Sequence, residues 1–301
     1  MLLLPPQITA LEHAGHSALQ LTTGHGKLVI ALHGAHVLSW LPTDQRDVFW
    51  LSPASLPEPA AIRGGVPVCW PWFAKQGQTS SAVHHGPVRN LAWQISAIHI
   101  CTDDEISISL EPVLQLQGNL AAAGVAAGLQ VSLHLTLGET LQQTLHTQNL
   151  GSGPFVLSQA LHSYYAVSHA QKIAIEGIQG LTYTDRLREL AQDVQRTPFV
   201  LEQACDRTYD HHLEVNASRL HRYTLVDPDW QRSIVIDVAG SQSVVVWNPG
   251  LENARYMPDV PNAGWPNFMC IEAANAGPDV VHLQAGENHT LTQHLRVTAI
   301  F

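Results

Sequence analysis

The sequence predicts an all-β protein, organised as a large β-sandwich with only a few short helices. Short segments in which apolar and polar residues alternate recur along almost the whole chain, and glycine, proline, asparagine or aspartate separates them. This pattern is typical of β-strands and their turns. Because βαβ units need a helix between successive strands and amphipathic helices are scarce, the pattern favours a sandwich. No internal repeat or long polar linker divides the chain, so residues 1–301 are expected to form a single domain.

The alternating segments give the expected elements in order. Asp103–Asp104 and Gly138–Glu139 are expected to be hairpin turns. One short helix is expected over Asp185–Gln192 with Asp185 as its N-cap, and the glycine- and alanine-rich stretch Gly118–Gly128 reads as a flexible connection. The expected strands are Lys27–Leu32, His36–Trp40, Leu91–Ile100, Glu105–Leu110, Leu129–Leu137, Thr140–Thr147, Phe155–Leu161, Lys172–Ile175, Ser233–Val238, Ser243–Trp247, Val280–Leu283 and His289–Val297.

Composition and charge limit the classes of partner. Hydrophobic residues make up 45% of the chain, which is enough for a substantial core. Lys+Arg 15 against Asp+Glu 25 gives a net charge of -10, and no lysine-rich run is present, so nucleic acid and anionic membranes are not expected partners. A small anion remains compatible with this charge, because salt screens exposed charges beyond about 8 Å and a few arginines can dominate locally.

The cysteines and the N-terminal residues indicate the compartment. The cysteines are widely spaced without a C-x-x-C motif, as in a reduced intracellular protein. The start Met1–Pro6 lacks the basic region and long apolar core of a signal peptide, and no apolar run reaches the ~20 residues that span a bilayer. We therefore expect a cytoplasmic protein. It is separately expected to act as a monomer.

Several common site motifs are missing. The 18 histidines include two H-x-x-H pairs, but neither has the form H-E-x-x-H, and no cysteine spacing supports zinc. A metal site is therefore not expected. The chain contains no G-x-S-x-G nucleophile elbow, no P-loop and no G-x-G-x-x-G, so serine-hydrolase chemistry and nucleotide binding are also not expected.

The segment Ile62–Phe73 is too irregular for a helix and too rich in proline for a central strand. Its two glycines allow backbone angles that other residues avoid, and its prolines restrict the chain. It reads as a rigid, aromatic-packed loop that holds Arg63 in a chosen place. A structural loop with a solvated arginine is the simpler alternative.

Two titratable residues occupy unusual surroundings. Glu272 is a lone carboxylate within the apolar and small-residue run Met269–Asn275, and His162 ends the apolar segment Phe155–Leu161. An outward-facing glutamate and a core or surface histidine are the simpler interpretations. If Glu272 faces inward, burial would raise its pKa toward the range useful for a general base.

Seven segments stand out when the chain is taken as a whole: Gly34–Trp40, Ile62–Phe73, His85–Arg89, Leu161–His162, Asp206–Tyr209, Val246–Pro249 and Cys270–Ala273. Together they resemble the aldose 1-epimerase superfamily, and more closely its hexose-6-phosphate mutarotase branch. The similar segments follow the family's order and cover nearly the whole chain. One departure is Pro87–Val88, where the family usually has Phe-Ala between the glycine and the arginine of the histidine segment.

The resemblance implies a galactose-mutarotase-like β-sandwich, or supersandwich, with the sugar site on a concave sheet face. It implies an isomerase that interconverts the α and β anomers of an aldohexose 6-phosphate, with glucose 6-phosphate as the leading candidate, and that needs no metal or organic cofactor. On this reading Glu272 is the general base that removes the proton from the O1 hydroxyl. His162 is the general acid that protonates the ring oxygen.

The remaining roles that the resemblance implies concern substrate binding. His85 would hold a sugar hydroxyl or the ring-side oxygen, and Asp206 would accept hydrogen bonds from sugar hydroxyls, with Asp185 as the competing candidate. Arg63 and Arg89 would grip the 6-phosphate, because a guanidinium offers a planar fork to phosphate oxygens.

Three points stay open at this stage. Either Trp247 or Trp72 could stack on the sugar ring. A non-catalytic carbohydrate-binding or regulatory module on the same fold is an alternative function, since a fold does not determine an activity. A mutarotase for unphosphorylated aldoses is the other alternative.

Overall fold

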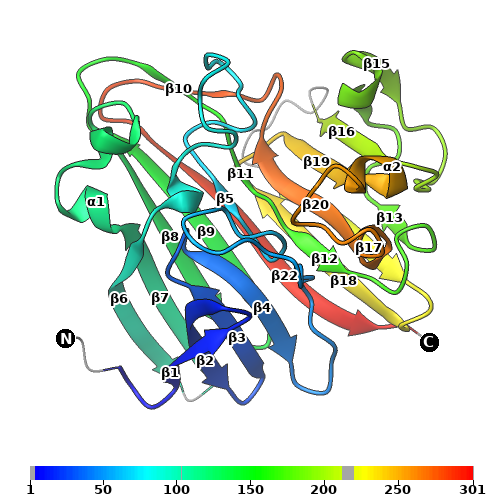
Figure 1. Ribbon diagram of the computed structural model, residues 1–301, viewed down its shortest axis with the longest axis horizontal. Coiled ribbons are helices and arrows are strands. Elements are labelled where there is room, and N and C mark those ends of the chain that lie inside the picture. Colours follow the sequence, from blue (N-terminus) through cyan, green and yellow to red (C-terminus); the bar gives the residue numbers. More distant parts are fainter. Residues whose placement is uncertain (1–3, 103, 212–219, 301) are drawn as a thin grey trace.

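The computed structural model describes residues 4–102, 104–211 and 220–300 (Figure 1). Strands account for 49% of the residues and helices for 8%, which confirms the all-β prediction with few short helices. Every strand pairing within the described ranges is antiparallel. Two expectations concern residues outside these ranges, namely the start Met1–Leu3 and the turn residue Asp103.

The first eight-stranded sheet, called the site sheet below, carries the candidate site. Its strands run in the order β15-β14-β16-β19-β20-β11-β5, and β12 also pairs with β20. The bounds are β5 (Val68–Cys69), β11 (Gln159–Leu161), β12 (Tyr164–Ala166), β14 (Thr182–Asp185), β15 (Ala191–Val194), β16 (Cys205–Asp210), β19 (Ser243–Asn248) and β20 (Phe268–Asn275).

The second eight-stranded sheet, called the back sheet, has the order β13-β17-β18-β22-β9-β8-β7-β6. It contains the long strands that run across Figure 1. Their bounds are β6 (Trp93–Thr102), β7 (Glu105–Pro112), β8 (Leu129–Leu137), β9 (Leu141–Asn149), β13 (Ala174–Glu176), β17 (His221–Asp227), β18 (Arg232–Ala239) and β22 (Asn288–Ala299).

A four-stranded sheet and a two-stranded ribbon complete the strands. The four-stranded sheet is an N-terminal meander, β1-β2-β3-β4, and the ribbon pairs β10 with β21. The bounds are β1 (Ile8–His13), β2 (His16–Thr23), β3 (Gly26–Ala31), β4 (His36–Pro42), β10 (Phe155–Leu157) and β21 (Val281–Leu283). The helices are the single turns α1 (Val113–Leu116) and α2 (Gly250–Ala254), with 3-10 turns at Val88–Asn90, Leu120–Ala123, Arg186–Arg188 and Trp265–Asn267.

The prediction of a helix over Asp185–Gln192 is wrong. Asp185 ends β14 and its carboxylate accepts a hydrogen bond from the Leu187 amide, as expected of a cap, but only the 3-10 turn Arg186–Arg188 follows before β15 begins. Strand pairing of β14 with β15 and β16 therefore overrides the local preference for a helix. The expected strand Phe155–Leu161 is broken at Ser158 into β10 and β11, which join different sheets.

The core lies between the two large sheets and determines which side chains remain for the site. On β20, Met269, Ile271 and Ala273 belong to the main hydrophobic cluster, which also contains inward-facing residues of the back sheet. Because side chains alternate along a strand, Cys270 and Glu272 face the other side of the site sheet. The sandwich thus presents Glu272 on the face that is turned away from the core.

Two further features concern the cysteines and the helices. Cys69, Cys101, Cys205 and Cys270 are all free thiols. No helix in the described part of the chain is long and apolar enough to cross a membrane.

Candidate active site

Strand register aligns the candidate residues on the outer face of the site sheet. Trp247 on β19 lies opposite Asp206 on β16 and opposite Cys270 on β20, while Val245 lies opposite Glu272. Residues two apart on a strand share a face, so Asp206, Trp247 and Glu272 point to the same side. A cavity of about 200 Å³ lies over this face. It is lined by Arg63, Phe73, His84, His85, Arg89, His162, Arg186, Asp206, Val245, Trp247, Met257 and Glu272.

The loop that carries Arg63 is rigid because its glycines allow close backbone contacts. Gly64 and Gly65 have φ values of +101° and +58°, and a Cβ atom on Gly65 would lie 2.2 Å from the Val37 carbonyl oxygen. The Arg63 carbonyl accepts a hydrogen bond from the Ser52 amide at 3.0 Å. The main chain on both sides of the arginine is therefore held in place, as the sequence predicts.

The side chain of Arg63 is fixed at two points. Its Nε atom donates to Oδ2 of Asp259 at 2.9 Å, and Nη1 donates to the Tyr164 hydroxyl at 2.7 Å. Burial opposes the charge, but Tyr164 and Asp259 outweigh it and raise the pKa of Arg63. Arg63 is a permanent positive charge at the wall of the cavity.

Arg89 brings a second positive charge to the same cavity and has fewer partners. It lies on the 3-10 turn Val88–Asn90. Among the described residues, no acceptor is within hydrogen-bond distance of its buried Nε atom. Burial and the nearby charge of Arg63 lower the pKa of Arg89. Because a buried donor without a partner is costly, this guanidinium favours an anionic ligand.

His85 is held in one tautomer by the backbone. It adopts a positive φ of 63°, and it precedes Gly86, where a Cβ atom would lie 1.9 Å from the Trp70 carbonyl oxygen. The Ala74 amide donates to His85 Nδ1 at 3.0 Å. Burial lowers the pKa of His85 well below its usual value, so the ring is neutral and Nε2 carries the hydrogen. His85 therefore acts as a donor within the cavity that it lines.

His162 and Glu272 form the centre of the site. His162 follows β11, in which Leu161 lies opposite Ala273 of β20, so the histidine stands next to Glu272. Nε2 of His162 lies 3.4 Å from Oε1 of Glu272. Within the described part of the chain, the buried atoms His162 Nδ1 and Glu272 Oε2 have no hydrogen-bond partner.

Burial shifts both pKa values toward the neutral forms. It raises the pKa of Glu272 well above its usual value, with a further contribution from Asp206. It lowers the pKa of His162 well below its usual value, and the charges of Arg63 and Arg89 lower it further. The pair therefore holds one proton that either group can carry, which is the requirement for paired acid and base catalysis.

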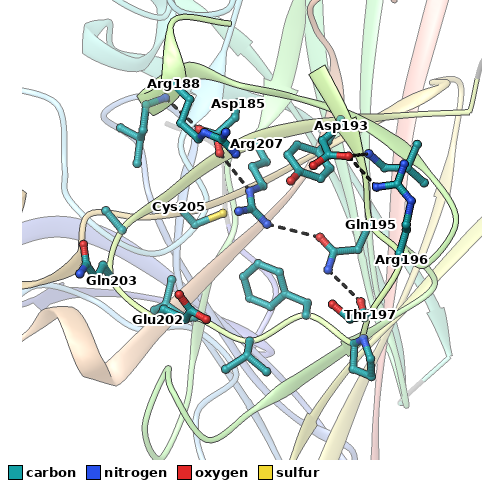
Figure 2. A pocket seen from close by; sticks show the side chains of 18 residues that line it. Asp185, Arg188, Asp193, Gln195, Arg196, Thr197, Glu202, Gln203, Cys205 and Arg207 are labelled. Carbon is teal, nitrogen blue, oxygen red and sulfur yellow. Dashed lines mark hydrogen bonds and ion pairs between the residues drawn. The ribbon is translucent and has the colours of Figure 1, made fainter. Parts of the chain in front are cut away.

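The structure separates the two aspartates that the sequence left in competition. Asp206 lines the cavity, and burial raises its pKa while Arg186 opposes the shift. Asp185 lines a different cavity of about 930 Å³, where its Oδ2 accepts a hydrogen bond from Arg207 Nε at 3.2 Å (Figure 2). The two cavities meet opposite faces of β16, because Asp206 lines one, Arg207 lines the other, and the two residues are consecutive on that strand.

Trp247 and Trp72, the two candidates for stacking on the sugar ring, also lie in different places. Trp247 lines the cavity, whereas Trp72 is buried and its Nε1 atom donates to the Val83 carbonyl at 2.7 Å. Trp247 also packs edge-on against His162, with ring centroids 5.9 Å apart. Stacking on a sugar is therefore available to Trp247.

Several residues of the site were not found from the sequence. Arg186 lies over the ring of Phe73 at 5.1 Å and adds a third arginine to the cavity. Tyr164 and Asp259 hold Arg63. Tyr164 lies two residues after His162, which the sequence singled out, so proximity to that histidine could have found it. Asp259 carries no local signal. No group of three or more candidate metal ligands occurs among the described residues.

Comparison with known families decides the classification. The family model described as Aldose 1-epimerase matches residues 17–296. The chain belongs to the aldose 1-epimerase family. A Salmonella typhimurium relative named "Putative glucose-6-phosphate 1-epimerase" is 32% identical over 255 residues, which cover 83% of this chain and 80% of that protein. An Escherichia coli relative of the same name is 30% identical over 252 residues, covering 83% and 80% of the two chains.

Solved structures agree with this placement in the aldose 1-epimerase family. A crystal structure from Salmonella typhimurium described as a "putative mutarotase" superposes with a TM-score of 0.85 at 26% identity, covering 99% of this chain and 96% of that one. A galactose mutarotase-like protein from Clostridium acetobutylicum gives a TM-score of 0.72 at 15% identity, covering 97% and 98% of the two chains. The second likeness supports the fold alone. The predicted galactose-mutarotase-like sandwich is confirmed.

Proposed function

We propose that this aldose 1-epimerase family member interconverts the α and β anomers of an aldohexose 6-phosphate, with glucose 6-phosphate as the substrate to test first. The observation that carries the proposal is the 3.4 Å contact of His162 Nε2 with Glu272 Oε1, in a cavity that also contains Arg63 and Arg89. An acid and a base adjoin there, and the arginines supply a site for a phosphate. The names of the Salmonella and Escherichia relatives agree with this substrate.

The proposed reaction needs two proton transfers in each direction. The step starts from the form of the pair in which the shared proton lies on His162. Glu272 then takes the proton from the O1 hydroxyl while His162 gives its proton to the ring oxygen, and the C1–O5 bond breaks to leave the open-chain aldehyde. Rotation about the C1–C2 bond exposes the other face of the carbonyl. The ring closes when the O5 hydroxyl attacks C1, with the proton transfers reversed. One proton enters the pair as one leaves, so the site returns to its starting state without any cofactor step.

His85 and Asp206 are proposed to hold the sugar during this rotation. His85 presents an N–H donor because the Ala74 amide occupies its other nitrogen. Asp206 offers a carboxylate from the same sheet face as Trp247. Arg89 is proposed as the main phosphate ligand because its Nε has no acceptor among the described residues. Arg63 adds a second positive charge, and its hydrogen bonds to Asp259 and Tyr164 hold its guanidinium in a fixed position.

Anomer exchange measured by NMR magnetisation transfer tests the acid and base. Glu272→Gln and His162→Ala should each lower the exchange rate of glucose 6-phosphate by about 10²–10⁴-fold. His134→Ala, which removes an imidazole from the outer face of the back sheet, should leave it unchanged. If both site variants keep the wild-type rate, the assignment of roles is wrong. If the wild-type protein binds the sugar phosphate but exchange stays at the buffer rate, the protein is a binding module.

One observation favours a second candidate, a mutarotase for unphosphorylated aldoses. The charge of Arg63 is already balanced by Asp259, with Nε and Oδ2 2.9 Å apart, so one of the two arginines is partly satisfied without phosphate. Comparing glucose with glucose 6-phosphate separates the candidates. Arg89→Ala should raise the KM for glucose 6-phosphate and leave that for glucose unchanged. Equal effects on both sugars would remove the phosphate role.

The remaining expectations about the whole protein are also proposals. We propose that residues 1–301 act as one domain, that the protein works as a monomer and that it resides in the cytoplasm. The main hydrophobic cluster supports a single domain, because it contains residues from both large sheets and from the N-terminal meander.

A further inference from the structure

The ring and the hydroxyl of Tyr164 contact two different parts of the site. Tyr164 is buried on β12, opposite Cys270 of β20. Its ring is stacked on His162, with centroids 4.9 Å apart and planes 9° from parallel. Its hydroxyl oxygen accepts a hydrogen bond from Arg63 Nη1 at 2.7 Å. One side chain therefore contacts both the proposed acid and a proposed phosphate ligand.

The main chain of Tyr164 strengthens this connection. The Tyr164 amide donates to the Gly65 carbonyl at 2.9 Å, and the Trp50 amide donates to the Tyr164 carbonyl at 2.8 Å. The Gly65 amide in turn donates to the Trp50 carbonyl at 2.7 Å. Strand β12 and the arginine loop are thus held together by the backbone, so the Tyr164 hydroxyl meets Arg63 with little freedom on either side.

Aromatic packing holds the ring of Tyr164 in one orientation. Trp247 packs edge-on against it at 5.9 Å, and Phe268 lies at 5.2 Å on an inclined plane. Trp247 also packs edge-on against His162. The imidazole is therefore confined between flat aromatic surfaces. The face of an aromatic ring carries partial negative charge. The Tyr164 ring therefore also favours the protonated form of the imidazole during the reaction.

We propose that Tyr164 is a positioning residue with two separable functions, in which its hydroxyl fixes Arg63 for the substrate phosphate and its ring fixes the imidazole of His162 for proton transfer. This inference rests on the proposed function, because it assigns parts of one side chain to substrate recognition and to catalysis. Burial raises the pKa of Tyr164, so the phenol stays protonated and does not itself exchange protons with the substrate.

Two substitutions separate the functions. Tyr164→Phe removes the hydrogen bond to Arg63 and keeps the stacked ring, so the KM for glucose 6-phosphate should rise about tenfold while kcat stays within about twofold. Tyr164→Leu removes the stacked ring as well, so kcat should also fall by about tenfold or more. The KM and kcat for free glucose should be unchanged in Tyr164→Phe if wild-type protein accepts that sugar.

Tyr165→Phe is the matched control. Tyr165 is the next residue on β12, but it faces the core between the sheets and packs against Phe49 with ring centroids 5.8 Å apart. Removing its hydroxyl should leave KM and kcat for glucose 6-phosphate unchanged. A general loss of packing would affect Tyr164→Phe and Tyr165→Phe alike, whereas the proposed connection affects only Tyr164→Phe.

The outcomes distinguish this inference from the proposed function. Wild-type protein without accelerated exchange overturns the proposed function itself. Active wild-type protein whose Tyr164→Phe variant keeps the wild-type KM, or loses kcat without a change in KM, overturns the role of the hydroxyl. The Phe variant decides this point even if Tyr164→Leu fails to fold. A folded Tyr164→Leu variant, verified by circular dichroism, with the kcat of Tyr164→Phe overturns the role of the ring.

Discussion

Asp259 Oδ2 accepts a hydrogen bond from Arg63 Nε at 2.9 Å, although 196 positions separate the two residues in the sequence. Asp259 is in turn held through its main chain, because its carbonyl oxygen accepts a hydrogen bond from the Ser52 hydroxyl at 2.6 Å. The Ser52 amide donates to the Arg63 carbonyl at 3.0 Å. Ser52 therefore holds the main chain of both the arginine and its counter-ion.

Asp259→Ala should lower both stability and substrate affinity. The substitution leaves a largely buried guanidinium with one partner fewer, which costs about 1–3 kcal/mol of unfolding free energy. Urea denaturation measures this loss, and the KM for glucose 6-phosphate should rise because Arg63 is less constrained. Asp229→Ala is the control, since its pair with Lys172 is exposed and solvent screening leaves such a pair little effect on stability. Equal losses in the two variants would contradict a special role for Asp259.

Gly65→Ala should destabilise the arginine loop. A Cβ atom at Gly65 would lie 2.2 Å from the Val37 carbonyl oxygen, so the backbone must move. Gly15→Ala is a matched control: Gly15 also has a positive φ, of +82°, but nothing lies within 4 Å of its Cβ position. The control should lose about 1 kcal/mol from the backbone angle alone, and Gly65→Ala should lose at least about 2 kcal/mol more.

The two losses are compared by urea denaturation, and the KM for glucose 6-phosphate is measured on both proteins. Of these two variants, only Gly65→Ala should raise KM, because Gly65 lies in the loop that carries Arg63 and Gly15 does not. A Gly65→Ala protein as stable as Gly15→Ala would show that the loop adapts without cost.

Alternating burial made some strands easy to locate from the sequence. β8 was predicted with its observed bounds, Leu129–Leu137, because buried and exposed side chains alternate along it. Every residue of β20 is buried, so its sequence shows no alternation, and the segment was not among the expected strands. The expected helix Asp185–Gln192 is replaced by the end of β14, a 3-10 turn and the start of β15, because β14 pairs with both β15 and β16.

Residues of the candidate site could be predicted where their signal lies within a short stretch of sequence. His162 and Glu272 stood out because each is a lone titratable residue next to an apolar run, and the structure brings them within 3.4 Å. Asp259 could not be found in this way, because its contact with Arg63 joins distant segments. Arg186 was hidden inside an expected helix and reaches the cavity only because a single 3-10 turn follows Asp185.

Binding of phosphate should raise the pKa of His162. The charges of Arg63 and Arg89 lower this pKa in the free protein, and a bound anion would balance them. NMR titration of the imidazole with and without inorganic phosphate measures the shift. Arg89→Ala should raise the pKa of His162 in the free protein and reduce the effect of phosphate. The imidazole of His134, on the outer face of the back sheet, serves as the internal control and should not respond.

A change in the opposite direction would contradict this prediction. If saturating phosphate left the pKa of His162 unchanged, the anion would bind away from the arginine pair. The phosphate group of the substrate would then have no part in setting the protonation state of the proposed acid.

Glu272→Gln should stabilise the protein at alkaline pH and much less at acidic pH. Burial raises the pKa of Glu272 in the folded state, so between the unfolded and folded pKa values the unfolded chain binds fewer protons. The contribution of Glu272 to stability therefore falls as pH rises above the usual glutamate pKa of about 4.3. Glutamine removes the ionisation, and each unit of pKa shift corresponds to about 1.4 kcal/mol.

Urea denaturation at pH 4.5 and pH 8 measures this difference, and Glu252→Gln is the control because that carboxylate is exposed on α2. The variant Glu272→Gln should gain unfolding free energy relative to wild type at pH 8, with the gain shrinking toward pH 4.5, while Glu252→Gln should show no such trend. A gain of equal size at both pH values would falsify the raised pKa and point to packing instead. Since the same variant loses the proposed general base, a protein that becomes more stable as it loses anomer exchange would show that burial of this carboxylate costs stability and serves catalysis.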